Sequence, residues 1–213
     1  MKKAGLLALT CALTAGLLLQ GCLPMAAVVG GAAVSSVNDR RTSGTQIDDE
    51  GIELRASNRI SERFGDRVHV SVTAFTRSVL LTGEVPNEAA KADIEKLASG
   101  VTNVRGVTND LAVAGSSALT SRANDTYLTS KVKARFVDVN HFNPFHVKVV
   151  TENSTVYLLG IVTEAEAKSA TDIARTTGGV RKVVRLFEYC KLGDEVCRGP
   201  SPRADQQRAP TKQ

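Results

Sequence analysis

The chain has 213 residues, a formal net charge of +5 and few aromatic side chains, 4% of the total with no Trp. So small a positive excess argues against a nucleic-acid-binding protein, and the scarcity of aromatic rings leaves no stacking platform for single strands. The length allows two small domains or one of ordinary size.

Residues 1–21 have the form of a secretory signal peptide. Lys2 and Lys3 precede an apolar run from Ala4 to Leu19, which is too short for a comfortable membrane span and is followed by small residues. The Leu-Gln-Gly-Cys sequence that ends at Cys22 resembles the bacterial lipobox, in which the cysteine is acylated. Two or three acyl chains there would anchor the protein firmly. The alternative is an ordinary signal peptide followed by a chance cysteine.

Residues 22–46 are expected to form a leash between this anchor and the first folded region. The first part is apolar and rich in small residues, so it either lies against the lipid surface or is a disordered spacer. The part from Ser35 to Thr45 is polar. A polar segment of this kind buries too little apolar surface to fold by itself, so we expect a solvated linker.

The first folded region, 47–114, opens with a helix and two strands. Apolar residues recur every four positions up to Phe64, which indicates a helix. Valines alternate with polar residues over 68–72, which indicates a strand with one buried face, and a second strand follows at 79–85.

A second helix and a third strand complete this region. Asn87 can cap the helix, and its apolar residues Ala90, Ile94 and Leu97 would face inward. The last strand is expected to run without interruption over 104–113.

The second folded region, 124–190, repeats this order of elements. Its segment 145–162 matches 68–85 at a shift of 77, with seven of eighteen positions identical, which is more than shared composition would give. Its first helix carries the same apolar spacing up to Phe136. The second region therefore copies the scaffold of the first.

The predicted fold class is α+β, with two tandem units, each a three-stranded mixed sheet with two helices on one face in the order α-β-β-α-β. The crossover from the second to the third strand should be right-handed. Because each core is small, we expect the two units to pack together. Residues 115–123 are expected to be a linker and residues 191–213 a disordered tail.

The repeated positions are apolar and carry no shared acid, base or nucleophile, so we expect neither an enzyme nor a small-molecule substrate. His69 and His146 face away from the buried valines, with no second ligand at a useful spacing, so we expect no metal. Gly83 and Gly160 favour a close backbone approach over a phosphate cradle, because no glycine-rich loop opens the helix that follows.

Two cysteines remain once Cys11 leaves with the signal peptide and Cys22 is acylated. In an oxidising compartment Cys190 and Cys197 can form a disulfide that closes a short loop, and two free thiols are the alternative. Apart from the lipid on Cys22, we expect no cofactor.

The strand–Gly–helix unit that ends in VRGVTNDLAV, 104–113, resembles the BON domain. The whole chain is similar to dual BON-domain outer-membrane lipoproteins of Gram-negative bacteria, most specifically from Asn124 to Lys168. In the lipoprotein pattern, Leu23 after the cysteine, in place of Asp, favours the outer membrane. The resemblance implies a non-enzymatic, periplasm-facing protein that supports envelope integrity. It also implies binding of anionic phospholipid by the first helix of the second repeat.

A helical wheel of that helix, drawn from the residues alone, also favours binding of anionic phospholipid. Tyr127, Lys131 and Arg135 form one stripe beside the core stripe, so a ring can enter a headgroup layer while two cations meet phosphates. We expect the lipid contacts to be Tyr127, Leu128, Lys131, Lys133 and Arg135, with Lys133 peripheral. The alternative is an ordinary solvated helix face.

The corresponding stripe of the first repeat, Arg55, Arg59 and Arg63, has no aromatic residue. Phe142 and Phe145 either reach lipid or, more commonly for such residues, fill local core. A second function remains open, that of a protein–protein adaptor for the outer-membrane β-barrel assembly or division machinery. It would use the first repeat or an exposed strand edge.

Overall fold

The computed structural model describes residues 39–115 and 117–198. The expectations for the signal peptide, Cys22, most of the leash and the tail beyond Arg198 lie outside the described residues.

The first repeat begins with a long helix whose buried face carries Ile52, Ala56 and Ile60. Asn87 caps the second helix as predicted, because its side chain accepts a hydrogen bond from the Ala90 amide at 2.8 Å. The elements are α3 (Ser43–Phe64), a 3₁₀ turn (Gly65–Arg67), β1 (His69–Phe75), β2 (Ser78–Val85), α4 (Glu88–Ser99), β3 (Gly106–Asn109) and β4 (Ala112–Val113).

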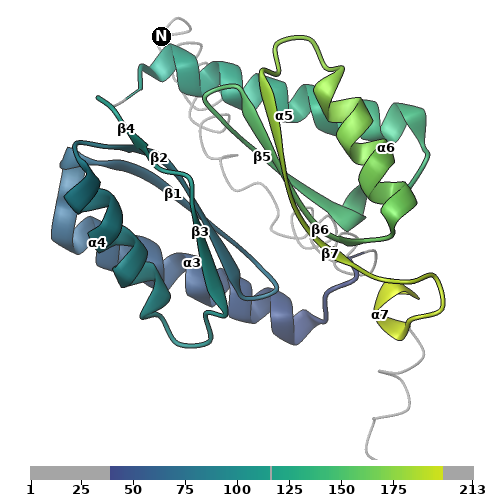
Figure 1. Ribbon diagram of the computed structural model, residues 1–213, viewed down its shortest axis with the longest axis horizontal. Helices are drawn as coiled ribbons and strands as arrows, with labels where there is room; N and C mark the ends of the chain where they lie inside the picture. The colour runs from purple at the N-terminus through teal and green to yellow at the C-terminus, as the bar shows by residue number, and fades with distance from the viewer. Residues whose placement is uncertain (1–38, 116, 199–213) are drawn as a thin grey trace, which may run out of the picture. The chain divides into compact units, whose positions relative to one another are not determined.

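The sheet of this repeat is mixed, with β2 antiparallel to β1 and parallel to both β3 and β4. Helices α3 and α4 cover one face of the sheet (Figure 1), and their apolar residues share a core with that face. The expected third strand is interrupted. Leu111 turns into the core, where it is 2% exposed, and this divides the strand into β3 and β4.

The second repeat has the same order of elements, and its helices cover one face of its sheet. Thr163 and Glu166 form a reciprocal capping box at the start of its second helix. The elements are α5 (Leu119–Val139), a 3₁₀ turn (Pro144–His146), β5 (Val147–Glu152), β6 (Thr155–Val162), α6 (Glu164–Arg175) and β7 (Lys182–Tyr189). The sheet order is β5-β6-β7, antiparallel and then parallel. The predicted α+β fold is confirmed.

A buried aspartate on the first helix of each repeat holds the first hairpin. Asp49 accepts hydrogen bonds from the amides of Thr76 and Arg77, at 2.9 and 2.6 Å. Both loop residues have positive φ, 50° and 65°, which is unusual for residues other than glycine. A buried carboxylate that satisfies both amides stabilises this conformation.

The second repeat builds the same arrangement with Asp125. Its two carboxylate oxygens accept hydrogen bonds from the amides of Asn153 and Ser154, each at 2.8 Å. These loop residues also have positive φ, 47° and 59°. The two repeats therefore do share an acidic residue with one role, contrary to the expectation from the aligned strands.

Folded structure extends beyond the expected boundaries. Helix α3 begins at Ser43, inside the segment expected to be solvated linker, and Arg40 before it is buried. Helix α5 begins at Leu119, which shortens the expected linker. A short helix, α7 (Glu195–Arg198), follows the last strand in what was expected to be disordered tail, and Cys197 is buried there.

The outer faces of the two sheets contact each other within a single compact unit of the chain. Phe75 and Leu80 of the first repeat form an apolar cluster with Tyr157, Leu159 and Ile161 of the second. Polar contacts surround this cluster. The Tyr157 hydroxyl donates to Asp110 at 2.7 Å, Lys148 pairs with Glu53 at 2.9 Å, and Thr76 bonds to Glu188. These contacts agree with the expectation that the two small cores pack together.

Candidate functional site

Helix α5 of the second repeat carries all the residues expected to contact lipid. Its inward face consists of Leu128, Val132 and Phe136, none more than 2% exposed. Leu128 was expected both in this core stripe and among the lipid contacts. Because its side chain is enclosed by the core of its own repeat, it cannot reach a membrane surface, and that part of the prediction is wrong.

Tyr127 lies on the outer face of α5, where it is 63% exposed. The Lys131 ammonium lies 5.8 Å from the centre of the Tyr127 ring and donates a hydrogen bond to the Gly178 carbonyl at 3.0 Å. One turn of helix therefore presents an aromatic ring and a cation together, in a geometry that suits a cation–π contact.

Arg135 has a structural role that the sequence did not predict. Its guanidinium donates to the Ile173 carbonyl at 2.7 Å and to the hydroxyls of Thr177 and Thr176 at 2.7 and 3.2 Å. These acceptors lie at the C-terminal end of α6, where carbonyl groups lack helical partners and the helix dipole is negative. Arg135 thus joins α5 to α6 through bonds from its Nη1 and Nη2 atoms.

Lys133 is exposed on another side of α5, beside an open cavity of about 310 Å³. Val137 and Phe145, which are 61% and 48% exposed, also line this cavity. Phe142, by contrast, is 7% exposed and packs edge-on against Phe136, with ring centres 5.0 Å apart. Of the two phenylalanines, Phe142 fills local core and Phe145 is available at the surface.

The corresponding face of the first repeat, on α3, is also exposed. Arg55, Arg59 and Arg63 all lie at the surface, and Arg63 pairs with Asp93 at 2.7 Å. Two large apolar side chains of α3, Ile47 and Leu54, are 69% and 63% exposed. The Arg63 guanidinium lies 6.0 Å from the centre of the Phe64 ring, but Phe64 is partly buried against the core of its repeat. Helix α3 therefore presents cations and aliphatic residues without an exposed aromatic ring.

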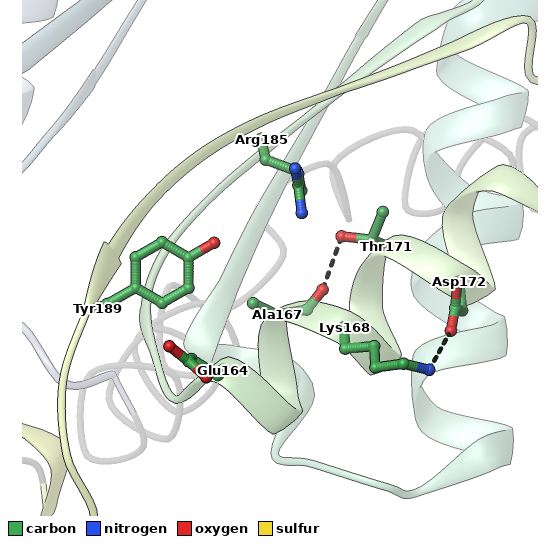
Figure 2. A pocket seen from close by; sticks show the side chains of 7 residues that line it. All are labelled: Glu164, Ala167, Lys168, Thr171, Asp172, Arg185 and Tyr189. Atoms are coloured by element: carbon green, nitrogen blue, oxygen red, sulfur yellow. Dashed lines mark hydrogen bonds and ion pairs between the residues drawn. The ribbon is translucent and has the colours of Figure 1, made fainter.

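A second cavity, of about 330 Å³, lies between α6 and β7 (Figure 2). Figure 2 shows Arg185 extending from β7 towards Thr171, with Tyr189 further along the same strand. Lys168 and Asp172 on the rim pair with each other at 3.1 Å. Two acidic and two basic residues line this cavity, so its charge favours no ligand of one sign.

The two histidines have carboxylate neighbours that the sequence did not suggest. His146 bonds to Glu166 at 3.1 Å. His69 lies opposite Glu84 in the β1–β2 register, and one ligand atom from each of His69, Glu84 and Glu152 lies within 4.8 Å of the others. Spacing along the sequence did not indicate these neighbours, because the carboxylates come from other elements and, for His69, also from the other repeat.

Glycine and cysteine have the structural roles considered above. A Cβ atom on Gly83 or Gly160 would lie 2.0 or 2.3 Å from the carbonyl oxygen of His69 or His146, so both glycines permit a close backbone approach. Cys190 and Cys197 form a disulfide, which closes a loop of eight residues after β7.

Arg40 is a structural residue that the sequence did not reveal. Its guanidinium donates to the carbonyls of Cys197 and Ile161 at 2.7 and 2.9 Å and pairs with Glu166 at 2.7 Å. The signal in the sequence is weak, because Arg40 stands in a short polar stretch whose composition is typical of linkers.

Comparison with known proteins agrees with this architecture. The family model of the BON domain matches residues 48–115 and 124–191, the two repeats described above. No helix within the described residues, 39–115 and 117–198, has the length and apolar character needed to cross a bilayer.

Three relatives align over most of the chain. "Outer membrane lipoprotein DolP" of Haemophilus influenzae is 39% identical over 83% of this chain and 93% of that protein. The "21 kDa hemolysin" of Actinobacillus pleuropneumoniae is 30% identical over 71% of this chain and 79% of that protein. "Osmotically-inducible protein Y" of Escherichia coli is 30% identical over 66% of this chain and 72% of that protein. The chain therefore belongs to the BON-domain family, as an outer-membrane lipoprotein with two such domains.

Proposed function

We propose that this lipoprotein, anchored by acyl chains on Cys22 and facing the periplasm, binds anionic phospholipid through α5 and so supports envelope integrity without catalysing a reaction. The observation that carries the proposal is the pairing of a 63% exposed Tyr127 with the Lys131 ammonium, 5.8 Å from the ring centre. No nucleic acid is part of this proposal.

The physical basis is the structure of a bilayer surface. A tyrosine ring can enter the layer of headgroups while its hydroxyl stays hydrated. A lysine held beside it then meets phosphate groups, which contributes about 1 kcal/mol per cation near an anionic surface. Lys133, together with the exposed Val137 and Phe145, adds a second cationic and apolar contact further along α5.

Helix α3 lacks an exposed aromatic ring, because its aromatic residue, Phe64, packs partly against the core of its repeat. Arg63 is partly neutralised by Asp93, and Arg55 and Arg59 supply charge without an exposed ring. Charge without an inserting ring gives weak attraction that salt screens. We therefore assign the lipid contact to the second repeat only.

The test is flotation of the unacylated protein, lacking residues 1–22, with vesicles of phosphatidylglycerol and phosphatidylethanolamine at low salt. Tyr127→Glu should abolish flotation, because it replaces the inserting ring with a like charge. Arg59→Glu is the matched control on α3 and should leave flotation largely intact. Phosphatidylcholine vesicles should recruit neither the parent protein nor its variants.

Equal losses in the two variants, or none in either, would contradict the assignment to α5. Lys131→Ala should weaken binding about fivefold, the equivalent of about 1 kcal/mol. Circular dichroism of each variant separates loss of binding from loss of fold.

A specific observation favours a second function, that of a protein–protein adaptor for the assembly of outer-membrane barrels or for division. Ile47 and Leu54 of α3 are 69% and 63% exposed and lie two helical turns apart on one face. An exposed aliphatic pair of this kind is typical of a protein-interaction surface. A photo-crosslinking residue at position 54 should capture a barrel-assembly or division protein in cells, whereas one at 127 should capture lipid.

A further inference from the structure

The contact between the two sheets changes from apolar to polar towards the end of β2. Glu84 near that end faces His69 across the β1–β2 pair. Glu152 comes from the end of β5 in the second repeat. We call His69, Glu84 and Glu152 the His–Glu–Glu cluster.

The geometry of the His–Glu–Glu cluster is close to that of a coordination site. One ligand atom from each residue lies within 4.8 Å of the other two. A zinc ion with bonds of about 2.0–2.2 Å holds its ligands about 3.4 Å apart, so small side-chain rotations close the site. His69 and Glu84 are paired on adjacent strands, so two ligands are already held close together. Glu152 of the second repeat supplies the third ligand.

The cluster has an excess of negative charge for its degree of burial. Glu84 is 7% exposed. Asp125, which is 5% exposed, and the half-buried Glu152 add two carboxylates, and Arg122 lines the same cavity as both. One arginine does not balance three carboxylates, and a divalent cation would.

A separate observation points to a missing partner at this place. The Thr82 hydroxyl has no hydrogen-bond partner within the described part of the chain, although Thr82 is only 1% exposed. Thr82 lies two residues from Glu84 on the same face of β2, and the Glu152 carboxylate is its neighbour from the second repeat. Buried hydroxyls are almost always satisfied, so a group such as a metal-bound water is expected next to Thr82.

We propose that His69, Glu84 and Glu152 bind one divalent cation of the zinc class and that this ion joins the two repeats. One imidazole nitrogen and two carboxylate oxygens suit zinc, whereas calcium and magnesium take oxygen ligands almost exclusively. An open cavity of about 350 Å³, lined in part by His69, Asp125 and Glu152, provides access from solvent. The proposal does not depend on lipid binding.

The experiment is calorimetric titration of the detergent-solubilised full-length protein, without a polyhistidine tag and after removal of metals, with ZnCl₂ at pH 7.4. We expect one zinc ion per chain, with no comparable heat for MgCl₂ or CaCl₂. His69→Ala should weaken zinc binding by about 100-fold, and Glu152→Gln, which keeps the side-chain shape, by at least about tenfold. His141→Ala, on an exposed loop, removes a similar imidazole and should leave binding unchanged.

A second readout does not depend on affinity. Co²⁺ in the same site should give the visible absorption of a four- or five-coordinate nitrogen and oxygen environment, and Glu152→Gln should alter that spectrum. The proposal is overturned if zinc does not bind, if it binds His69→Ala as well as the parent, or if His141→Ala weakens binding equally. If Glu152→Gln stabilises the fold while no zinc binds, the two carboxylates share a proton and hold no metal.

Discussion

Arg40 and Glu166 form an ion pair with 2.7 Å between Nη1 and Oε2, and only 7% and 15% of their side chains are exposed. Arg40 precedes the first helix of the first repeat, whereas Glu166 caps α6 of the second. Burial would raise the pKa of Glu166, but hydrogen bonds from Arg40, the Thr163 amide and His146 lower it to about 2. The residue before the first repeat is therefore held by the second.

Arg40→Ala should destabilise the protein by about 3 kcal/mol, because it leaves a partly buried carboxylate without its cation. Urea unfolding at pH 7 measures this loss. Arg63→Ala is the matched control, since the Arg63–Asp93 pair is 57% and 45% exposed, and exposed pairs contribute less than about 1 kcal/mol. Equal effects of the two substitutions would show that Arg40 does not connect the repeats.

The acid limb of the stability curve should change as well. The folded pKa of Glu166, about 2, lies below its ordinary value of 4.5, so the pair stabilises the fold above pH 4.5 and loses this contribution as the pH falls towards 2. The free energy of unfolding of Arg40→Ala should therefore fall less steeply with decreasing pH over this interval.

Glu152→Gln should stabilise the metal-free protein above pH 7. The folded pKa of Glu152, about 7, exceeds its ordinary value of 4.5, because of burial and then because of Glu84 and Asp125. The native state binds more protons than the unfolded state between these values, so stability is fully present below pH 4.5 and falls as the pH rises through 7. Thermal unfolding in EDTA from pH 5 to 8 measures this slope, which should be reduced in the variant. An unchanged slope in Glu152→Gln would show that Glu152 does not cause this pH dependence of stability.

Asp49→Ala and Asp125→Ala should each cost about 2–3 kcal/mol, because each leaves two hairpin amides without their acceptor. Hydrogen exchange should show faster exchange at Thr76 and Arg77 in the first variant and at Asn153 and Ser154 in the second. Asp138→Ala, at an exposed position of α5, should change neither stability nor exchange. Slow exchange at both hairpins in all three variants would contradict the role of the aspartates.

Arg135→Ala should reduce stability by about 1–2 kcal/mol and leave vesicle binding intact while the protein stays folded, because the guanidinium caps α6. Lys133→Ala should do the reverse and weaken vesicle binding without loss of stability. Flotation and urea unfolding of the same samples test both. Loss of binding in folded Arg135→Ala would return this arginine to the lipid contacts.

The order of elements could be predicted because each element satisfies a local rule. The valine alternation of the strands and the Asn87 cap depend on neighbours within a few residues. The division of the third strand could not be predicted, because Leu111 turns inward to fill a core made by α3 and α4.

The candidate site was predictable in part for a similar reason. Helical spacing correctly placed Tyr127 outside and Val132 inside. It could not show that Arg135 meets the end of α6, since that contact spans 38 residues or more. Arg40 and the His–Glu–Glu cluster also depend on the folded arrangement, in which residues distant in sequence meet.

The paired aspartates have a consequence for how the two halves of this chain are compared. The buried residues of the two helices coincide at an offset of 76: Asp49, Ile52, Ala56 and Ile60 in α3 and Asp125, Leu128, Val132 and Phe136 in α5. Apolar spacing alone, matched at Phe64 and Phe136, would suggest an offset of 72 and place Asp49 opposite Ser121. The aspartate therefore fixes the helix register, because it stands three residues before the first core position of each helix and serves the same pair of hairpin amides. In proteins of this type, this acidic position is a better guide to equivalence between repeats than the apolar periodicity, which a shift of one helical turn leaves nearly unchanged.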